Sequence, residues 1–462
     1  MTHWKRLLVM GLFVSTQAYA QQPTTTAPTA TLQTAPAGGA TTLSLADALS
    51  TALAQNPDYR QQLNNESPAN MAVKSAYATF LPSATVSGGF NYTGSGQSNF
   101  GGTNVIKTSS SVGSSYNVNL SWGLDGRTLM APGQTRANLR ATQKQIDAAN
   151  VSLRSSVLTQ YLTVLQTNAR IAITTQAVAR NQVFLDLARA RYQVGQATML
   201  DVRQAEVTRG QADVDVLVAK QNNDDARLEL YRLMGVSAPV VLDQVTLTDS
   251  FPVVKPGYNL DSLLALAATT NPNLLAAQAS AQAAGYNVTA VKGEYFPSIS
   301  AQANWNGYTQ KYNDTTAATG SNTGTYPWGF TGQPFQVFAG LQLPIFTGLQ
   351  RETRVSEAKA RRDDAAEQVR AQSLLVRTQV TSRMLAVNAT YEAIGVAEAN
   401  KVAANDQLRL AQDRYRLGNG TALELSDSEG AVQRAEGTYV DAVYAYHKAV
   451  AALEEAVGRP LR

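Results

Sequence analysis

Arg191-Tyr192-Gln193-Val194-Gly195 and Arg414-Tyr415-Arg416-Leu417-Gly418 decide the fold of this chain, because they are two copies of one pattern set 223 residues apart. Apolar or aromatic side chains recur at every seventh position up to each copy, with Lys401 as the one exception. Such an apolar repeat is typical of a long coiled-coil helix. The first set is Val157, Val164, Ile171, Val178, Leu185 and Tyr192, and the second is Val380, Val387, Ile394, Lys401, Leu408 and Tyr415. Glycine can take the left-handed conformation that ends a helix, and Thr198 and Thr421 can cap the next helix. Each segment is therefore predicted to be the tip of a helical hairpin.

The duplication extends over most of the chain. Asn56-Pro57 recurs 215 residues later as Asn271-Pro272, and Leu81-Pro82 recurs at the same interval as Phe296-Pro297. Two copies of one unit are therefore expected. The predicted divisions are a signal peptide at 1–20, a flexible tail at 21–42, a first repeat at 43–236, a linking segment at 237–258, a second repeat at 259–458 and a C-terminal tail at 459–462.

The composition of the 462 residues excludes several classes of function. A formal net charge of only +4 indicates no nucleic-acid partner. There is no cysteine, and so no disulfide, thiolate metal site, cysteine nucleophile or cysteine for a lipid anchor. His3 lies in the leader and His447 stands alone, which gives histidine catalysis or zinc binding little to work with. The sequence predicts neither an enzyme nor a cofactor.

The first twenty residues have the pattern of a secretory signal. They combine a basic start at Lys5-Arg6, an apolar run over 7–14 and a small-residue exit at Ala18-Tyr19-Ala20. A buried first helix is the alternative, but the polar Gln21-Gln22-Pro23 follows at once and favours cleavage. Residues 21–42 are mostly Thr, Ala, Pro and Gly, which is typical of a flexible tail. No other window approaches the roughly 20 apolar residues of a transmembrane helix, so any membrane contact is expected from strands.

Two pairs of strands are predicted, at about 82–124 and about 297–346. Apolar and polar residues alternate there, as in a strand with one polar face. The Gly-, Ser- and Asn-rich stretch 93–114 is expected to be a long loop between the first two strands. The non-polar faces are Ala84, Val86, Gly88, Phe90 and Tyr92; Tyr116, Val118, Leu120 and Trp122; Ile299, Ala301, Ala303 and Trp305; and Phe335, Val337, Ala339, Leu341 and Leu343.

An ordinary half-buried antiparallel sheet would give the same alternation. Here the other faces carry Ser, Asn and Gln with almost no charge, and a secretion signal is predicted, as an outer-membrane barrel requires. Four strands cannot close a barrel, because open edges are not tolerated in lipid. Two chains would supply eight strands around an interior filled by side chains, whereas three would supply twelve and leave an aqueous bore. A trimer is therefore the smaller assembly that could conduct.

Long helices are expected from about Pro132 to Tyr192 and from about Arg351 to Tyr415, each about 90 Å long. Shorter return helices are expected over about 198–234 and 421–457. A helix over 58–80 and a return helix together have the length of one long helix. The pair is therefore predicted to stack end to end beside it.

The signal, the duplicated order of helix, strand pair, long helix and return helix, and the paired Arg-Tyr-x-x-Gly tips resemble the TolC family of outer-membrane efflux proteins, the outer membrane factors. The resemblance spans 43–462 and includes Pro344-Ile345-Phe346-Thr347-Gly348, Leu233-Met234-Gly235 and Ala456-Val457-Gly458. It implies a mainly α fold with a membrane β-barrel portion. In a trimer, a twelve-stranded β-barrel would continue into a periplasmic α-barrel of twelve helical columns. It also implies a tip that stays closed until an inner-membrane pump, of RND or ABC type, and a periplasmic adaptor engage it.

Family members carry acidic side chains just inside the closed tip, on the helix after the second Arg-Tyr-x-x-Gly. The matching residues are Glu424 and Asp427, which are three positions apart and so share one helical face. The resemblance thus implies an entrance ring of six carboxylates in three chains. The alternative is that both acids merely complement the helix macrodipole.

The resemblance further implies polar ties between the hairpins of neighbouring chains, which lock the tip. Gly420 stands where the best-known pattern has an arginine, so Arg414 or Arg416 is a candidate to replace it. The candidate residues are Asp201, Tyr192, Tyr415, Arg414 and Arg416 for the lock, and Gly195, Gly418 and Gly420 for the turns.

The expected function is an outer-membrane channel-tunnel of a Gram-negative bacterium, serving tripartite efflux or type I secretion. It would conduct small molecules or polypeptides to the exterior, with a homotrimer, an adaptor, a pump and outer-membrane lipid as partners. A barrel-anchored trimeric coiled-coil stalk with a structural or adhesive role is the first alternative, and a soluble periplasmic helical protein with a small sheet is the second. The helices are rich in Ala, Gln and Thr outside their seams, which favours a wide hollow bundle over a stalk.

Overall fold

The computed structural model describes residues 41–100, 104–242, 245–312 and 325–461. The predicted signal peptide lies outside them, as does the predicted tail except for Thr41 and Thr42. Those two residues belong to the first strand, so regular structure begins earlier than the predicted end of the tail.

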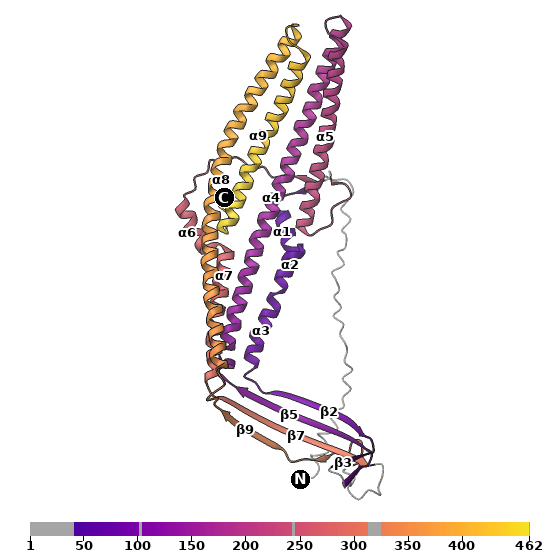
Figure 1. Cartoon of the computed structure of the whole chain (residues 1–462). Helices are drawn as coiled ribbons and strands as arrows, with labels where there is room; N and C mark the ends of the chain where they lie inside the picture. Colours follow the sequence, from indigo (N-terminus) through magenta and orange to yellow (C-terminus); the bar gives the residue numbers. More distant parts are fainter. Residues whose placement is uncertain (1–40, 101–103, 243–244, 313–324, 462) are drawn as a thin grey trace.

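The described chain is an elongated stack of three levels (Figure 1). Two helical hairpins form one end, short helices flank the middle, and a sheet forms the opposite end. The helices are α1 (Leu45–Gln55), α2 (Pro57–Asn64), α3 (Glu66–Ala78), α4 (Gly126–Gln193), α5 (Met199–Met234), α6 (Leu260–Thr270), α7 (Pro272–Lys292), α8 (Gln350–Arg416) and α9 (Ala422–Val457). The strands are β1 (Thr41–Leu43), β2 (Ser83–Thr93), β3 (Gly96–Phe100), β4 (Asn104–Thr108), β5 (Ser111–Leu124), β6 (Val245–Leu247), β7 (Ser298–Tyr312), β8 (Thr331–Gly332) and β9 (Gln336–Gln342).

The sheet confirms the predicted division into an apolar and a polar face. Strands β2, β5, β7 and β9 lie side by side in that order and are all antiparallel, and the short β8 also pairs with β7. Directly paired residues share a face. The apolar face therefore joins Val86 to Val118 and Trp305, while the polar face joins Ser87 to Asn117 and Asn306. Every residue of the edge strand β2 is exposed, so the described chain leaves both faces of this strand largely uncovered.

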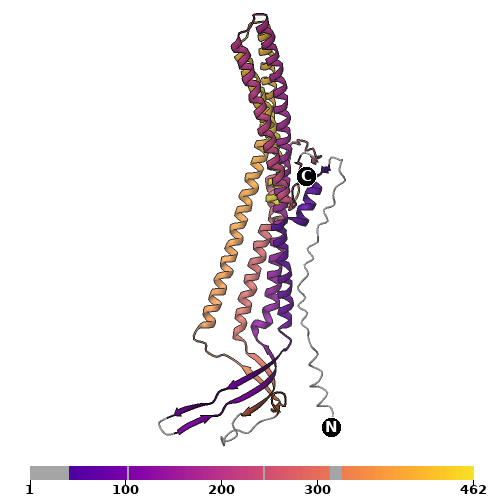
Figure 2. The ribbon, with the colours of Figure 1, turned by 90° about the vertical axis from the view of Figure 1, so that its right-hand side faces the viewer.

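The helical prediction is confirmed in its main lines. Helices α4 and α8 run through the whole helical part, and α5 and α9 return beside them from the tips (Figure 2). Helix α4 begins at Gly126, earlier than the expected Pro132, which lies inside the helix. The early start is explained by Asp125, whose carboxylate caps the helix by accepting a hydrogen bond from Thr128 N at 2.6 Å. The described helices include none that is long and apolar enough to cross a membrane.

Two predictions about local structure were wrong. The segment expected to form one helix over 58–80 is divided into α2 and α3 at Asn65. The segment 93–114, expected to be a loop, contains β3 and β4, which pair with each other, and the first residues of β5. In the first place the helical type was correct and only the break was missed; in the second, polar strand residues were misread as a loop.

The predicted end-to-end stacking is confirmed at a junction that occurs once in each repeat. Asn56 donates a hydrogen bond from Nδ2 to Leu233 O at 2.8 Å, and its Oδ1 accepts one from Tyr59 N at 2.9 Å. One side chain thus satisfies both the last turn of α5 and the first turn of α2. In the second repeat Asn271 makes the same two bonds, to Ala456 O at 2.8 Å and from Leu274 N at 2.9 Å, and joins α9 to α7.

Glycine completes each junction because the backbones approach too closely for a side chain. Gly235 and Gly458 end α5 and α9 with φ of 72° and 89°. A Cβ on Gly235 would lie 2.4 Å from Gln55 O, and one on Gly458 would lie 2.5 Å from Thr270 O. In each repeat, the Asn-Pro that starts one helix therefore packs directly against the glycine that ends another.

Candidate functional site at the hairpin tips

The turn at each tip has the conformation that the sequence predicts. Gly195 and Gly418 have φ of 75° and 81°, the left-handed region that favours glycine. Their amides donate to Tyr192 O at 3.0 Å and to Tyr415 O at 3.1 Å. Gly420 has a different reason to be glycine, because a Cβ placed on it would lie 3.0 Å from Tyr415 N.

Asp201 belongs to a helix cap in this chain. Its carboxylate accepts hydrogen bonds from the backbone N (2.8 Å) and the hydroxyl (2.9 Å) of Thr198, whose hydroxyl in turn accepts one from Asp201 N. This capping box starts α5. The predicted lock residue therefore makes its described hydrogen bonds within its own hairpin.

The two tyrosines of the repeated pattern lie in different surroundings. Tyr415 is only 3% exposed, whereas Tyr192 is 43% exposed. The ring of Tyr415 contacts Phe184 edge-on, with 5.6 Å between centroids, and the guanidinium of Arg191 lies over the ring at 4.6 Å from its centroid. Burial raises the pKa of the Tyr415 hydroxyl; the charge of Asp201 also raises it, and that of Arg191 lowers it.

Arg191 is therefore the described tie between the two tips, and the sequence interpretation did not assign it this role. Its Nη1 donates to the carbonyl oxygen of Tyr415, and its Nη2 donates to Gln196 O at 3.3 Å. The guanidinium thus joins the α8–α9 turn to the α4–α5 turn. The signal was available in the sequence, because Arg191 is the first residue of the repeated pattern.

The predicted acidic pair divides into one neutralised and one free-standing carboxylate. Glu424 forms an ion pair with Arg414, 2.6 Å between Oε1 and Nη1, and its backbone N–H donates a hydrogen bond to the capping hydroxyl of Thr421. Asp427 is exposed one turn further along α9, and among the described residues it has no ion pair. Arg416 is also exposed. Arg414 and Arg416 were the candidates to replace the arginine that the family has at the position of Gly420. Arg414 makes an ion pair, but both partners of that pair belong to the same hairpin.

A buried ionic cluster further along the hairpins was not predicted. Arg180 of α4 lies between two carboxylates of α9, with Nε 3.1 Å from Glu429 Oε2 and Nη2 3.2 Å from Glu436 Oε2. Glu429 is only 5% exposed, and this burial raises its pKa although Arg180 lowers it. The seven-residue spacing of Glu429 and Glu436 was a usable signal, since it places both acids on one face of α9.

Two further hydrogen bonds join α5 of the first hairpin to α9 of the second. Thr208 Oγ1 of α5 lies 3.2 Å from Ser426 Oγ of α9, and Gln433 Nε2 donates to Asp215 Oδ2 at 3.0 Å. Near them Asn181 is buried, and its Oδ1 has no hydrogen-bond partner within the described chain. Toward the tips the two hairpins of one chain are therefore joined by these polar contacts as well as by an apolar cluster that includes Phe184, Leu408 and Tyr415.

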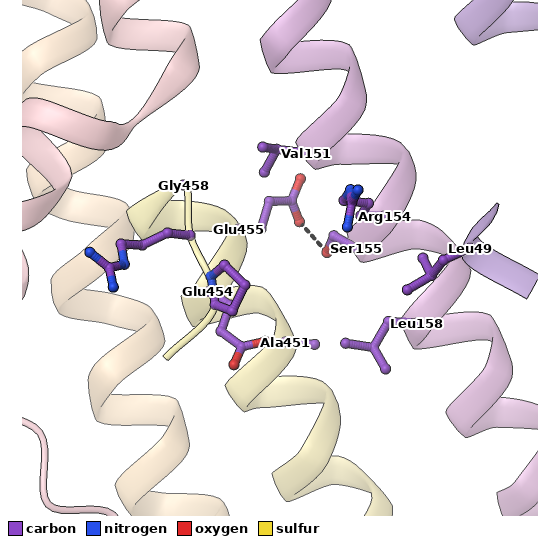
Figure 3. Close-up of a pocket in the computed structure, with 11 residues that line it drawn as sticks. Leu49, Val151, Arg154, Ser155, Leu158, Ala451, Glu454, Glu455 and Gly458 are labelled. Atoms are coloured by element: carbon purple, nitrogen blue, oxygen red, sulfur yellow. Dashed lines mark hydrogen bonds between the residues drawn. The ribbon is translucent and has the colours of Figure 1, made fainter. Parts of the chain in front are cut away.

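A small pocket of about 160 Å³ lies far from the tips, where α9 ends beside α4 (Figure 3). Leu49, Val151, Leu158 and Ala451 supply apolar walls, and Ser155 donates to Glu455 at 2.7 Å across it. Within the described ranges no group of three acidic or histidine side chains could hold a metal ion. At the tips the structure places charged groups, such as the Arg414–Glu424 pair, at the end of a helical column.

The tip glycines can be tested independently of the rest of the molecule. Replacing both Gly195 and Gly418 by Val should cost about 1–2 kcal/mol at each turn, because a left-handed β-branched residue is strained there. If the tips act in the efflux that the sequence predicts, export by cells that depend on this protein should fall, while the amount of folded protein stays unchanged. Unchanged export with both substitutions present would remove these turns from the mechanism.

Comparison with known proteins places this arrangement in context. A family model described as outer membrane efflux protein matches residues 48–236 and 263–459. The chain is 25% identical over 333 residues to the outer membrane efflux protein BepC of Brucella suis, covering 71% of this chain and 69% of that protein. It is 23% identical over 392 residues to the outer membrane protein TolC of Vibrio cholerae, covering 84% of each. The crystal structure of the Campylobacter jejuni CmeC outer membrane channel has the same fold, with a TM-score of 0.72 and 16% identity over 90% of this chain and 85% of that one.

Proposed function

This chain belongs to the outer membrane efflux protein family, the TolC family of outer-membrane channels, and on that premise we propose that it is the channel-tunnel of a tripartite efflux or type I secretion system. Members of this family are channels and not enzymes. In the proposed complex an inner-membrane pump supplies the energy, and a periplasmic adaptor links the pump to this chain. This chain supplies the path across the periplasm and outer membrane.

The observation that carries the proposal is the sheet below the helical columns. Its apolar face presents large side chains to the surroundings, including Val86, Phe90, Trp305 and Leu341, which are all exposed in the single chain. The opposite face consists mostly of Ser, Asn, Thr and Gln, with Tyr308, Tyr312 and Phe338 among them. A sheet of this kind suits lipid on one side and water on the other. Single-channel conductance in a planar bilayer tests the conduit against the stalk, since a stalk gives no conductance.

The proposal requires a homotrimer. Four long antiparallel strands leave β2 and β9 as open edges, and open edges are not tolerated in lipid. We expect the detergent-solubilised protein to have the mass of three chains, measured by light scattering with the detergent contribution subtracted. A monodisperse monomer would contradict the proposed architecture.

The acidic pair is proposed as the charged element of the periplasmic entrance. Because Arg414 pairs with Glu424, Asp427 is the carboxylate that each chain can contribute without compensation. Three such groups near one axis give a negative potential that low-dielectric walls focus. The entrance is therefore proposed to favour cations.

Ion selectivity tests the entrance. Asp427→Ala should weaken the cation preference of the open pore, and Arg414→Ala should strengthen it by freeing Glu424. Asp147→Ala is the control, because Asp147 lies in an exposed pair with Lys144 on α4 and, at physiological salt, its charge is screened beyond about 8 Å. Reversal potentials in a salt gradient measure the effect. Identical selectivity in wild type and all three variants would leave the acids as helix-terminus residues only.

A further inference from the structure

The segment 325–332, here called the rim segment, lies on the apolar face of the sheet. Phe90, Ser114 and Thr309 are directly paired across β2, β5 and β7, so they form one row on this face. Phe90 is 64% exposed at the edge of the row, whereas Ser114 is only 2% exposed. The Ser114 hydroxyl donates to the carbonyl oxygen of Pro327 at 2.5 Å, so the rim segment passes over this row.

Five aromatic side chains hold the rim segment on this face: Phe90, Tyr116, Trp305, Trp328 and Phe330, here called the rim cluster. Trp328 contacts Phe90 edge-on with 5.7 Å between ring centroids, and Phe330 contacts Tyr116 with 5.0 Å. Tyr116 in turn contacts Trp305 at 6.0 Å. The short β8 then pairs with β7 and returns the chain to the sheet. Trp328 remains 60% exposed and Trp305 49%, so the cluster still presents aromatic surface to its surroundings.

The rim cluster lies at the height where an apolar band of membrane thickness would end. Strand β7 starts at Ser298 beside the helical part and runs away from it, so Thr309 is near its far end (Figure 1). Ile299 and Thr309 are ten residues apart, which is about 33 Å along the strand and about 23 Å along the membrane normal at a tilt of about 45°. The apolar band of an outer-membrane barrel is about 25 Å tall. With Ile299 at the periplasmic boundary, the rim cluster is therefore at the external one.

Lys311 adds a positive charge at the same boundary. It is the only charged residue within the described strands β2, β5, β7 and β9. It pairs directly with Val112, so it shares the apolar face with Thr309, two positions before it, and its side chain is exposed. A lysine at the end of an apolar band lays its methylene chain along the apolar surface and extends its ammonium group to the headgroups.

We propose that the rim segment and Lys311 together bind lipid of the outer leaflet: the segment folds back along the outside of the barrel wall, and the ammonium group contacts a phosphate-bearing headgroup. This inference rests on the proposed outer-membrane barrel and names the partner of one segment. Tryptophan and tyrosine suit such a boundary because their rings are apolar and one edge is polar. Lipid is the occupant because the rim cluster is continuous with the apolar face that the barrel exposes to lipid. A segment that reached over the bore would instead pack on the polar face.

Tryptophan fluorescence tests the position of the rim segment. Once the predicted signal peptide is removed, the tryptophans are Trp122, Trp305 and Trp328. Replacing Trp122 and Trp305 by Phe leaves Trp328 as the reporter, and replacing Trp122 and Trp328 by Phe leaves Trp305. In phosphatidylcholine vesicles, we expect bromine near the headgroup to quench Trp328 more strongly than bromine near the chain ends, and iodide in the water to quench it weakly. Trp305, four residues before Thr309 on β7, is the matched control and should show the reverse order of the two brominated lipids.

The outcomes separate this inference from the proposed function. If iodide quenches Trp328 and neither brominated lipid does, the rim segment is in water and the inference is overturned. Quenching of Trp305 by brominated lipid in the same experiment would leave the proposed barrel standing. If brominated lipid quenches neither tryptophan, the sheet does not face lipid, and both the barrel and the inference are overturned.

Lys311→Gln tests the contact with phosphate, in the variant that keeps Trp328 alone. Brominated phosphatidylglycerol, which is anionic, should quench Trp328 more than the same fraction of brominated phosphatidylcholine, because the ammonium group enriches anionic lipid beside it. This excess should be lost in Lys311→Gln. It should remain in Lys220→Gln, the matched control, since Lys220 is an exposed lysine of α5 in the helical part. An excess that persists in Lys311→Gln would overturn the phosphate contact.

Discussion

Replacing Arg180 by methionine should destabilise the protein at pH 7 by about 3–5 kcal/mol, because it leaves two carboxylates buried without a counter-charge. Glu429 and Glu436 both accept from this one guanidinium, and both carboxylates are largely shielded from water. Methionine retains most of the side-chain length and packing, so that the lost charge dominates the result. Thermal unfolding of the detergent-solubilised protein, followed by loss of helical signal, measures the effect.

The loss of stability caused by Arg180→Met should grow as the pH rises. Burial already raises the pKa of Glu429, and the loss of Arg180 removes the charge that lowers it. A carboxyl group whose pKa is higher in the folded than in the unfolded protein loses stability as pH rises from its unfolded value, about 4.3, to its folded value. The stability of the variant should therefore be closest to that of wild type near pH 4 and furthest below it above neutral pH.

Two further variants control this experiment. Arg370→Met removes an exposed arginine that pairs with Glu367 on α8, and should cost less than about 1 kcal/mol. Adding Glu429→Gln and Glu436→Gln to Arg180→Met should recover much of the stability at pH 7. A deficit that is the same at every pH would show that lost packing, not buried charge, is responsible.

Replacing Gly458 by valine should cost about 3 kcal/mol or more. The left-handed backbone alone costs about 1–2 kcal/mol for a side-chain-bearing residue, and the Cβ would also meet backbone atoms that cannot move aside easily. It would lie 2.5 Å from Thr270 O and 2.8 Å from Pro272 Cδ. Unfolding midpoints and the yield of folded protein in the outer membrane report the result, and Gly235→Val should behave in the same way in the first repeat.

Gly195→Val is the matched control for both junction variants. Gly195 has nearly the same φ, 75°, but apart from its two chain neighbours no described residue has an atom within 4 Å of a Cβ placed on it. The difference between Gly458→Val and Gly195→Val therefore isolates the close approach of the two helix ends. Equal costs would mean that the junction yields to the added side chain.

The sequence predicted the fold well where the signal was periodic. The seven-residue spacing of Val380, Val387, Ile394 and Leu408 marks a face that is buried in the structure. Lys401, the exception in that series, is only partly exposed and holds its ammonium 4.7 Å from the centroid of the Tyr439 ring. Periodicity identifies the face of a helix, and packing then explains the exception.

The candidate site was predicted less completely, because contacts between hairpins do not follow from the pattern of either one. Tyr192 and Tyr415 occupy equivalent positions in the repeat, yet it is Tyr415 that lies beneath Arg191. Likewise, Arg180 and Glu429 are 249 residues apart, and only the packing of α4 on α9 brings them together. The exact roles of the tip residues therefore depend on which helices become neighbours.

The paired junctions also make the columns mechanically unequal. Helices α4 and α8 are continuous over 68 and 67 residues, so any twist along them must be distributed over their ladder of backbone hydrogen bonds. The columns beside them are interrupted, at Asn56 and at Asn271, where side-chain hydrogen bonds take the place of that ladder. Torsion applied at the tips would therefore be spread along two continuous helices, and in the other two columns it would concentrate at the Asn56 and Asn271 junctions, at the same place in both repeats.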